Sequence, residues 1–273
     1  MQFFLKNGFS ISPYFLPLQS GVFVARQEPF WGNFGVFDDS LPDGWGSLLL
    51  DRYLREQGVD VRKLTVLQCL ALVGTSGRGA LEFFPDKSIT QTVDFVDFDK
   101  FADEMQKILE NDDYTGNLTE TLYRFGGSSG GAQPKIFVKL EGKEWLVKFS
   151  ASNDRQNIGQ TEYEYSLLAK KSGIEMPETR LFEGKYFGVQ RFDRIENSKI
   201  HTISAAGLLN LNYRLPVLDY ADLLKVTIDL TRNMQEVEKM FRLAVFNAVI
   251  SNRDDHAKNF SFQYKNGEWQ LSP

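Results

Sequence analysis

The spacing of apolar residues predicts five helices in the chain. The clearest covers residues 234–250, where apolar side chains recur every three or four positions. They are Val237, Met240, Phe241, Ala244, Val245 and Ala248. We expect this stripe to face the core and so to fix the register of the loop that follows. Weaker helical patterns cover residues 47–56, 62–72, 94–110 and 161–172.

Short apolar runs predict strands between these helices. In residues 1–50, runs such as Gly21–Ala25 indicate strands joined by turns, and residues 80–85 indicate another strand that ends at a proline. Three hairpins are expected further on: residues 136–140 with 145–149, residues 181–194, and residues 260–264 with 269–271 around an Asn-Gly turn. The mixture is typical of an α+β protein.

Composition narrows the class of protein. The chain has 273 residues, enough for one large or two small domains, with ordinary apolar (42%) and charged (25%) contents. It has no long apolar run, so we expect no membrane span, and no secretion signal. The net charge of −5 argues against direct nucleic-acid binding. The single cysteine, Cys69, is expected to be a buried thiol, which agrees with a reducing cytoplasm.

The loop after the helix at 234–250 has the residues for phosphoryl transfer. Asp254 and Asn259 lie five positions apart in the run Asn252–Asn259. The acid could accept the proton of an attacking hydroxyl while the amide holds a metal ion on nucleotide phosphates. The alternative interpretation is a polar loop that only ends a helix.

A second loop, residues 126–135, consists mostly of small residues whose backbone N–H groups can approach phosphates. The hairpin after it places Lys148 among apolar neighbours, either facing those phosphates or facing solvent. The glycines of residues 74–79 are less suitable for a nucleotide, because the segment after them does not open a helix. Residues 36–46, which include Trp45, are interpreted as a turn and helix cap.

Two runs in these loops resemble signatures of the HipA family of bacterial serine/threonine kinases. They are Gly-Ala-Gln-Pro-Lys at residues 131–135 and Asp-Asp-His-Ala-Lys-Asn-Phe-Ser at residues 254–261. Residues 36–46 also resemble a motif of the family's N-terminal lobe. The similarity extends over nearly the whole chain. The family's members are the toxins of HipA/HipB-type toxin–antitoxin systems.

The resemblance implies an α+β, two-lobed kinase-like fold with a β-rich N-terminal subdomain. Residues 1–115 would form the HipA-like N-terminal subdomain, 116–194 the kinase N-lobe with glycine-rich loop and hinge, and 195–273 a partial C-lobe with the catalytic loop. Family members start earlier, and after the Leu-Ser-Pro of residues 271–273 they continue with a magnesium-binding aspartate. We therefore expect a chain that is truncated at both ends, with part of the 234–250 stripe left without partners and catalysis impaired.

The resemblance also assigns ATP and Mg²⁺ as cofactors and gives roles to individual residues. Asp254 would be the general base, with Asp255 disfavoured, and Asn259 would be a magnesium ligand. Ser128 would be autophosphorylated, which shuts down the kinase. Glu162, favoured over Glu164, would pair with Lys148. ATP contacts are expected from Gly130, Gly131, Ala132, Gln133, Pro134, Lys135, Lys148, Gln190, Arg191, Phe192, His256 and Lys258. Asp193 and Arg194 are interpreted as a structural ion pair or turn.

The implied function is a cytoplasmic toxin kinase that phosphorylates a protein serine or threonine. Targets in the family include aminoacyl-tRNA synthetases, and the partner would be a HipB-like antitoxin, a small DNA-binding repressor. A small separate protein would complete the N-terminal subdomain, as in some relatives. One alternative is a catalytically impaired kinase fold that serves as a nucleotide- or antitoxin-binding module. Another is a small-molecule phosphotransferase.

Overall fold

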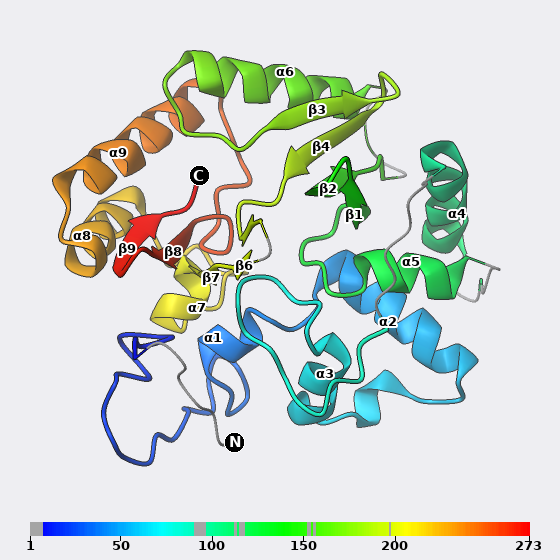
Figure 1. Cartoon of the computed structure of the whole chain (residues 1–273), viewed down its shortest axis with the longest axis horizontal. Coiled ribbons are helices and arrows are strands. Elements are labelled where there is room, and N and C mark those ends of the chain that lie inside the picture. Colours follow the sequence, from blue (N-terminus) through cyan, green and yellow to red (C-terminus); the bar gives the residue numbers. More distant parts are fainter. Residues whose placement is uncertain are drawn as a thin grey trace. The chain divides into compact units, whose positions relative to one another are not determined.

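The computed structural model describes residues 8–89, 97–111, 114, 118–151, 154, 157–196 and 198–273. The chain forms two compact units (Figure 1). Unit 1 combines Met1–Ser40 with Lys199–Ser272, and unit 2 consists of Leu41–Ser198 together with Pro273. Each unit has its own antiparallel sheet and its own helices. The division into three consecutive domains stays a prediction.

The sheet of unit 2 has four strands in the order β1-β2-β4-β3, and it confirms two of the predicted hairpins. Its strands are β1 (Lys135–Leu140), β2 (Lys143–Lys148), β3 (Thr179–Phe182) and β4 (Tyr186–Gln190). In the first hairpin Lys135 pairs with Lys148, so both lysines lie at the end next to the glycine-rich loop. Helix α6 (Ile158–Lys171) packs against β3 and β4 (Figure 1).

The other helices of unit 2 include those predicted at residues 47–56, 62–72 and 94–110, of which residues 94–96 lie outside the described ranges. They are α2 (Gly44–Glu56), η1 (Val61–Lys63), α3 (Val66–Val73), α4 (Phe98–Glu110) and α5 (Thr119–Gly126). The helix predicted at 62–72 is two helices in the structure, η1 and α3, because Thr65 caps the start of α3. The Thr65 hydroxyl accepts a hydrogen bond from the Gln68 N–H. The Gln68 side chain accepts one from the Thr65 N–H, which completes a capping box. The short strand β5 (Arg194–Ile195) follows β4 and pairs with β6 (Ser198–Lys199).

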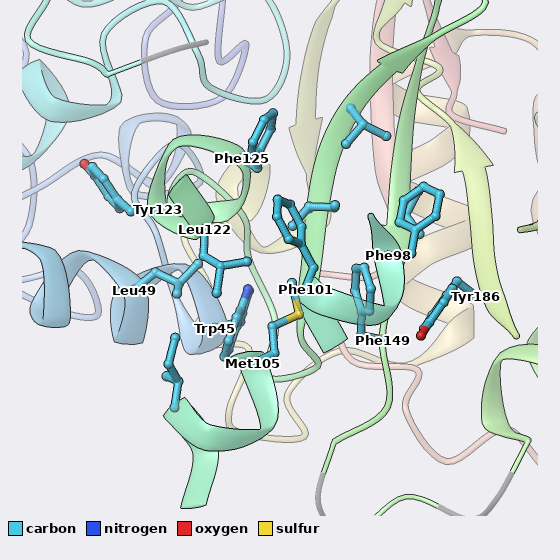
Figure 2. Close-up of a cluster of buried hydrophobic side chains, with 14 of the residues drawn as sticks. Trp45, Leu49, Phe98, Phe101, Met105, Leu122, Tyr123, Phe125, Phe149 and Tyr186 are labelled. Atoms are coloured by element: carbon cyan, nitrogen blue, oxygen red, sulfur yellow. The ribbon is translucent and has the colours of Figure 1, made fainter. Parts of the chain in front are cut away.

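The core of unit 2 joins these helices to one face of the sheet. Figure 2 shows side chains from α2, α4 and α5 in one buried cluster with Phe149 and Tyr186. Phe98 lies near the centre, with ring centroids of Phe182 and Tyr186 at 5.4 and 5.7 Å. Trp45 is only 1% exposed although it lies in the polar run at residues 36–46. The start of α2 is therefore fixed in the core, close to the base of the glycine-rich loop.

Unit 1 is built from both ends of the chain. Its sheet has the order β7-β8-β9, with β7 (His201–Ser204), β8 (Ser261–Lys265) and β9 (Glu268–Leu271). Its helices are α1 (Gly35–Asp38), α7 (Ala205–Leu209), α8 (Tyr220–Thr231) and α9 (Met234–Val249). Asp39 accepts hydrogen bonds from the Ser204 N–H and hydroxyl at 2.6 and 2.7 Å. This carboxylate joins the N-terminal segment to the start of α7.

The strands predicted at Gly21–Ala25 and at residues 80–85 are wrong. In the described residues 8–50, the only β-pairing is an isolated bridge between Ser12 and Leu16. Val22 and Val24 are 92% and 83% exposed. An apolar run forms a strand only where a neighbouring strand supplies its hydrogen bonds, and the described part of the chain offers none to either segment.

Only Met240 of the predicted apolar stripe of α9 is buried in the core. The buried residues of the helix are Glu236, Met240 and Asn247, whereas Phe241 and Val245 are 59% and 47% exposed. Phe241 and Val245 line an open apolar groove beside α8, so part of the stripe has no partner among the residues that the structure describes, as expected. The buried Glu236 is satisfied in this orientation, because its carboxylate accepts a hydrogen bond from the Leu271 N–H of β9 at 2.7 Å.

Two predictions from composition can be compared with the structure. No helix in the described ranges is long and apolar enough to cross a membrane. Cys69 lies in α3 and is half-buried, not fully buried as expected. Burial nevertheless raises the pKa of its thiol.

Candidate functional site

The N-cap and the first residues of α2, positions 43–46, hold the glycine-rich loop between α5 and β1. We call this segment the clamp turn. The Asp43 carboxylate accepts a hydrogen bond from the Gly131 N–H. The Trp45 N–H donates to the Gly131 carbonyl at 2.9 Å, and the Trp45 indole donates to the Lys135 carbonyl at 3.1 Å. The middle and the end of the loop are thereby attached to the start of α2.

The glycines of the clamp turn are required by this close approach. A Cβ atom on Gly44 would lie 2.4 Å from the Gly131 carbonyl oxygen, and one on Gly46 would lie 2.2 Å from that of Ser129. Both distances are far below van der Waals contact with backbone atoms that cannot move aside. The interpretation of this segment as a helix cap was incomplete, since Asp43 makes no side-chain bond to its own helix. The pair of glycines around Trp45 was the available signal.

Several groups of the loop remain available to an anion. In the described part of the chain, the N–H groups of Gly130, Ala132 and Gln133 have no hydrogen-bond partner. Free backbone N–H groups in a glycine-rich turn are a common phosphate-binding arrangement. Ser128 is partly exposed and its hydroxyl donates to the Ser76 carbonyl at 3.3 Å. Ser129 is buried and donates to the Gly126 carbonyl.

Two lysines lie beside the loop. Lys148 forms an ion pair with Glu162 on α6, with 2.8 Å between Nζ and Oε1. The favoured pairing is therefore present, whereas Glu164 accepts from Gln160 instead. Because α6 begins at Ile158 and not at Thr161, Glu162 lies in the second turn of the helix.

The second lysine, Lys135, is buried and donates to the Gly130 carbonyl. Burial, followed by the neighbouring charge of Lys148, lowers the pKa of Lys135 to about 8. Asp43 and Glu162 act in the opposite direction. The two ammonium groups form a positive site next to the free N–H groups.

The predicted hinge at Gln190–Phe192 is fixed by main-chain and ionic contacts. The N–H groups of Gln190 and Arg191 donate to the carbonyls of Glu178 and Glu144, both at 2.8 Å. The Arg191 guanidinium is buried against Asp193 at 2.8 Å. The ATP contact predicted for Arg191 is therefore not open to its side chain or its N–H group, because both are already engaged.

The ion pair interpreted for Asp193 and Arg194 is present, with 2.9 Å between Nη1 and Oδ2. It also holds the glycine run at residues 74–79. Asp193 accepts from the Gly79 N–H at 2.7 Å, and Arg194 donates to the carbonyls of Gly77 and Gly79. These glycines serve as a docked loop at the hinge, and no helix opens after them.

In unit 1, the loop after α9 separates the roles of its two adjacent acids. Asp254 is exposed, and its carboxylate lies 3.4 Å from His256 Nε2. Asp255 accepts a hydrogen bond from the Tyr220 hydroxyl at 2.9 Å, and that hydroxyl also accepts from Asn247. Burial, together with Asp255, raises the pKa of Tyr220 to about 12. Asp255 thus anchors the loop, whereas Asp254 is available to a substrate.

The other predicted residues of this loop, Asn259, His256 and Lys258, lie around Asp254 or contact one another there. The Asn259 amide donates to the Asp254 carbonyl, which leaves its Oδ1 atom for another ligand. The Lys258 N–H donates to His256 Nδ1 at 3.2 Å, so the ring proton lies on Nε2, toward Asp254. Lys258 lies 4.8 Å from the centre of the Tyr213 ring. Tyr213 and Tyr220 were not identified from sequence because they lie well before the motif.

The donor set suits a magnesium ion that is bound mainly through phosphates. In the ranges that the structure describes, no three His, Cys, Asp or Glu side chains are grouped to hold a metal by themselves. Mg²⁺ typically uses one or two carboxylates together with substrate phosphates and waters. Exposed oxygens of Asp254 and Asn259 fit that requirement. The loop and lysines belong to unit 2, and this second group belongs to unit 1.

The two family models that match the chain both describe HipA domains. The model of the HipA-like C-terminal domain matches residues 127–273, more than half of the chain, and that of the HipA N-terminal domain matches residues 2–84. The solved complex of HipA, HipB and operator DNA from the Shewanella oneidensis MR-1 toxin–antitoxin system contains a similar chain. The two share 20% identity with a TM-score of 0.65, over 97% of this chain and 67% of that one. This likeness supports the α+β kinase-like fold.

Two curated relatives carry kinase names. A Haemophilus influenzae protein named "Putative kinase" is 25% identical over 179 residues, 54% of this chain and 51% of that protein. A Sinorhizobium fredii protein named "Putative kinase Y4dM" is 23% identical over 140 residues, 45% of this chain and 34% of that protein. The matched region spans about half or less of the length of these relatives.

Proposed function

Because the chain belongs to the HipA family, we propose that it is a protein kinase that transfers the γ-phosphate of ATP to a serine or threonine hydroxyl. The observation that carries this proposal is the 2.8 Å ion pair between Lys148 and Glu162 beside a glycine-rich loop. A strand lysine paired with a helix glutamate is the arrangement that protein kinases need for phosphate binding.

Each unit supplies a different part of the chemistry in this proposal. In unit 2, the N–H groups of the loop and the ammonium groups of Lys135 and Lys148 bind the triphosphate. The Gln190 carbonyl and main-chain groups of Phe192 contact the adenine, since the Gln190 N–H already donates to the Glu178 carbonyl. In unit 1, Asp254 accepts the proton of the attacking hydroxyl.

The remaining predicted residues complete the phosphate and metal contacts. His256 donates from Nε2 and keeps Asp254 oriented, and Lys258 contributes positive charge near the phosphates. Asn259 would hold Mg²⁺, which neutralises phosphate charge when it is bound. Gly131 and Pro134 shape the loop around the triphosphate.

The cellular role follows the family. We propose a cytoplasmic toxin whose partner is a HipB-like antitoxin, a DNA-binding repressor like the HipB in the solved complex. An aminoacyl-tRNA synthetase is the proposed class of target. Autophosphorylation of Ser128 would inhibit the kinase, because about two negative charges would be added beside the phosphate site.

The test is the intact mass of the chain after incubation with ATP and Mg²⁺. We expect a gain of one phosphate that maps to Ser128 and is absent from Ser128→Ala but retained in Ser129→Ala. Ser129 is the matched control because it is adjacent and buried. ATP binding without any phosphate transfer, to this chain or to added protein, would instead indicate a binding module. Transfer to a metabolite alone would indicate a small-molecule phosphotransferase.

The lowered pKa of Lys135 predicts a pH dependence of ATP binding. The ammonium group loses its proton as pH rises through about 8, whereas a bound triphosphate raises the pKa of Lys135 and favours the charged form. Affinity should therefore fall with rising pH, by up to about tenfold between about pH 7.5 and about pH 9. Calorimetry should detect proton uptake over the same range.

Lys135→Arg should flatten this profile, because arginine stays charged. Lys139→Arg, an exposed lysine on the same strand, should leave it unchanged. A steep profile in Lys135→Arg would assign the titration to another group.

A further inference from the structure

We propose that Asp43 is a positioning residue that holds the glycine-rich loop in the conformation that binds phosphate. The proposal rests on the proposed function, since it concerns how the ATP-binding loop is prepared. Asp43 lies 88 positions before its partner, Gly131, and belongs to the clamp turn of α2. Nothing in the chemistry of phosphoryl transfer assigns it a role of its own.

The first argument concerns a single peptide group. The peptide between Gly130 and Gly131 has its carbonyl bound by the Lys135 ammonium and its N–H bound by the Asp43 carboxylate. Opposite charges thus hold the two ends of one dipole, and a rotation of that peptide would lose both charge-assisted bonds. The orientation of the peptide is fixed before any ligand arrives.

The second argument concerns the groups on either side of this peptide. Gly131 has a left-handed φ of +81°, and its carbonyl accepts from the Trp45 N–H. With both backbone groups of Gly131 engaged, the N–H groups of Gly130, Ala132 and Gln133 stay without partners in the described part of the chain. The clamp turn therefore takes one N–H and leaves its neighbours for an anion. Pre-organisation of this kind lowers the cost of binding.

The third argument is that Asp43 does not cap its own helix. An aspartate at the N-cap position usually accepts bonds from the first N–H groups of its own helix. Asp97, at the N-cap of α4, does so by accepting from Lys100. Asp43 occupies the corresponding position of α2 but makes no such bond and reaches the loop instead. Asp97 is for that reason the matched control.

The experiment measures hydrogen exchange of the loop peptide and ATP affinity in the full chain. Asp43→Ala should increase exchange at Gly131 N–H at least about tenfold and weaken ATP binding by about tenfold, the cost of one charge-assisted bond. Asp43→Asn keeps an acceptor oxygen but loses the charge, so both changes should be about threefold, between wild type and Asp43→Ala. Asp97→Ala should leave both unchanged although it loses a helix cap.

Asp43→Glu keeps the charge but moves the carboxylate by one methylene group, and it replaces the alanine variant should that one fail to fold. In Asp43→Glu the Gly131 N–H should exchange faster than in wild type, as in Asp43→Ala. Unchanged exchange in Asp43→Ala or Asp43→Glu would overturn the proposal. So would tighter ATP binding in both Asp43→Ala and Asp43→Asn, because the carboxylate would then be repelling the phosphates. If wild type does not bind ATP, the proposed function fails while hydrogen exchange still tests the clamp.

Discussion

Replacing Asp254 by asparagine should lower the rate of phosphoryl transfer by about 10³-fold while ATP affinity stays within about threefold of wild type. The carboxylate is exposed and contacts only His256 among the side chains described around it. The loop is held by main-chain atoms, because Asn259 donates to the Asp254 carbonyl and the Asp254 N–H donates to Asn252. An amide side chain keeps these contacts but cannot accept the substrate's proton.

The measurement is single-turnover transfer at saturating ATP, with Asp255→Asn as the control. Asp255 is the next residue and undergoes the same chemical change, yet its amide oxygen can still accept from the Tyr220 hydroxyl. We expect transfer within about threefold of wild type in that variant. Retained transfer in Asp254→Asn, or an equal loss in both variants, would refute the assignment of Asp254 as the base.

Lys148→Met should lower the catalytic rate about 100-fold and weaken ATP binding about tenfold. In the proposed arrangement the Lys148 ammonium group neutralises phosphate charge, and Glu162 keeps it in position at 2.8 Å. Glu162→Gln should have a smaller effect in the same direction. The double variant should be no worse than Lys148→Met, because glutamate acts through the lysine.

Thermal unfolding distinguishes this role from a structural one. The side chains of Lys148 and Glu162 are 29% and 24% exposed, so their ion pair should contribute only about 1 kcal/mol or less to the free energy of unfolding. Lys143→Met is the control, since Lys143 lies on the same strand and pairs with Glu178 at the surface. ATP binding in Lys148→Met equal to that of wild type would contradict its assignment as a phosphate ligand.

The elements that sequence predicted correctly are those whose partners lie nearby in the chain. The β1–β2 hairpin closes over two residues, and α3 begins at a capping box four residues long. The predictions failed for segments whose structure depends on a partner far away in the sequence. Gly21–Ala25 has the composition of a strand but no neighbouring strand within the described ranges. Helix α9 buries Glu236, which accepts a hydrogen bond from the Leu271 N–H. Alternation and periodicity report what a segment could bury, not which neighbour it meets.

The candidate site divides in the same way. Its two loops carry local motifs, so Lys135, Asp254 and Asn259 could be chosen from sequence, and their roles stay predictions. The Asp43 contact could not be chosen, because an aspartate before a helix is most simply a cap. The contacts of the Arg191 side chain could not be predicted either, because they include the carbonyl of Gly77, which is far away in the sequence.

The discontinuity of unit 1 has a consequence for biosynthesis. Asp39 and Ser204 are 165 positions apart, so the first segment leaves the ribosome long before β7 and α7 exist. At about 5–20 residues per second, that delay is on the order of ten to thirty seconds. Unit 2 is a continuous stretch apart from Pro273, and its residues 41–198 can fold during this interval. The segment with Asp254 belongs to the unit that closes last, so in a growing chain the glycine-rich loop can be folded before the proposed base is in place.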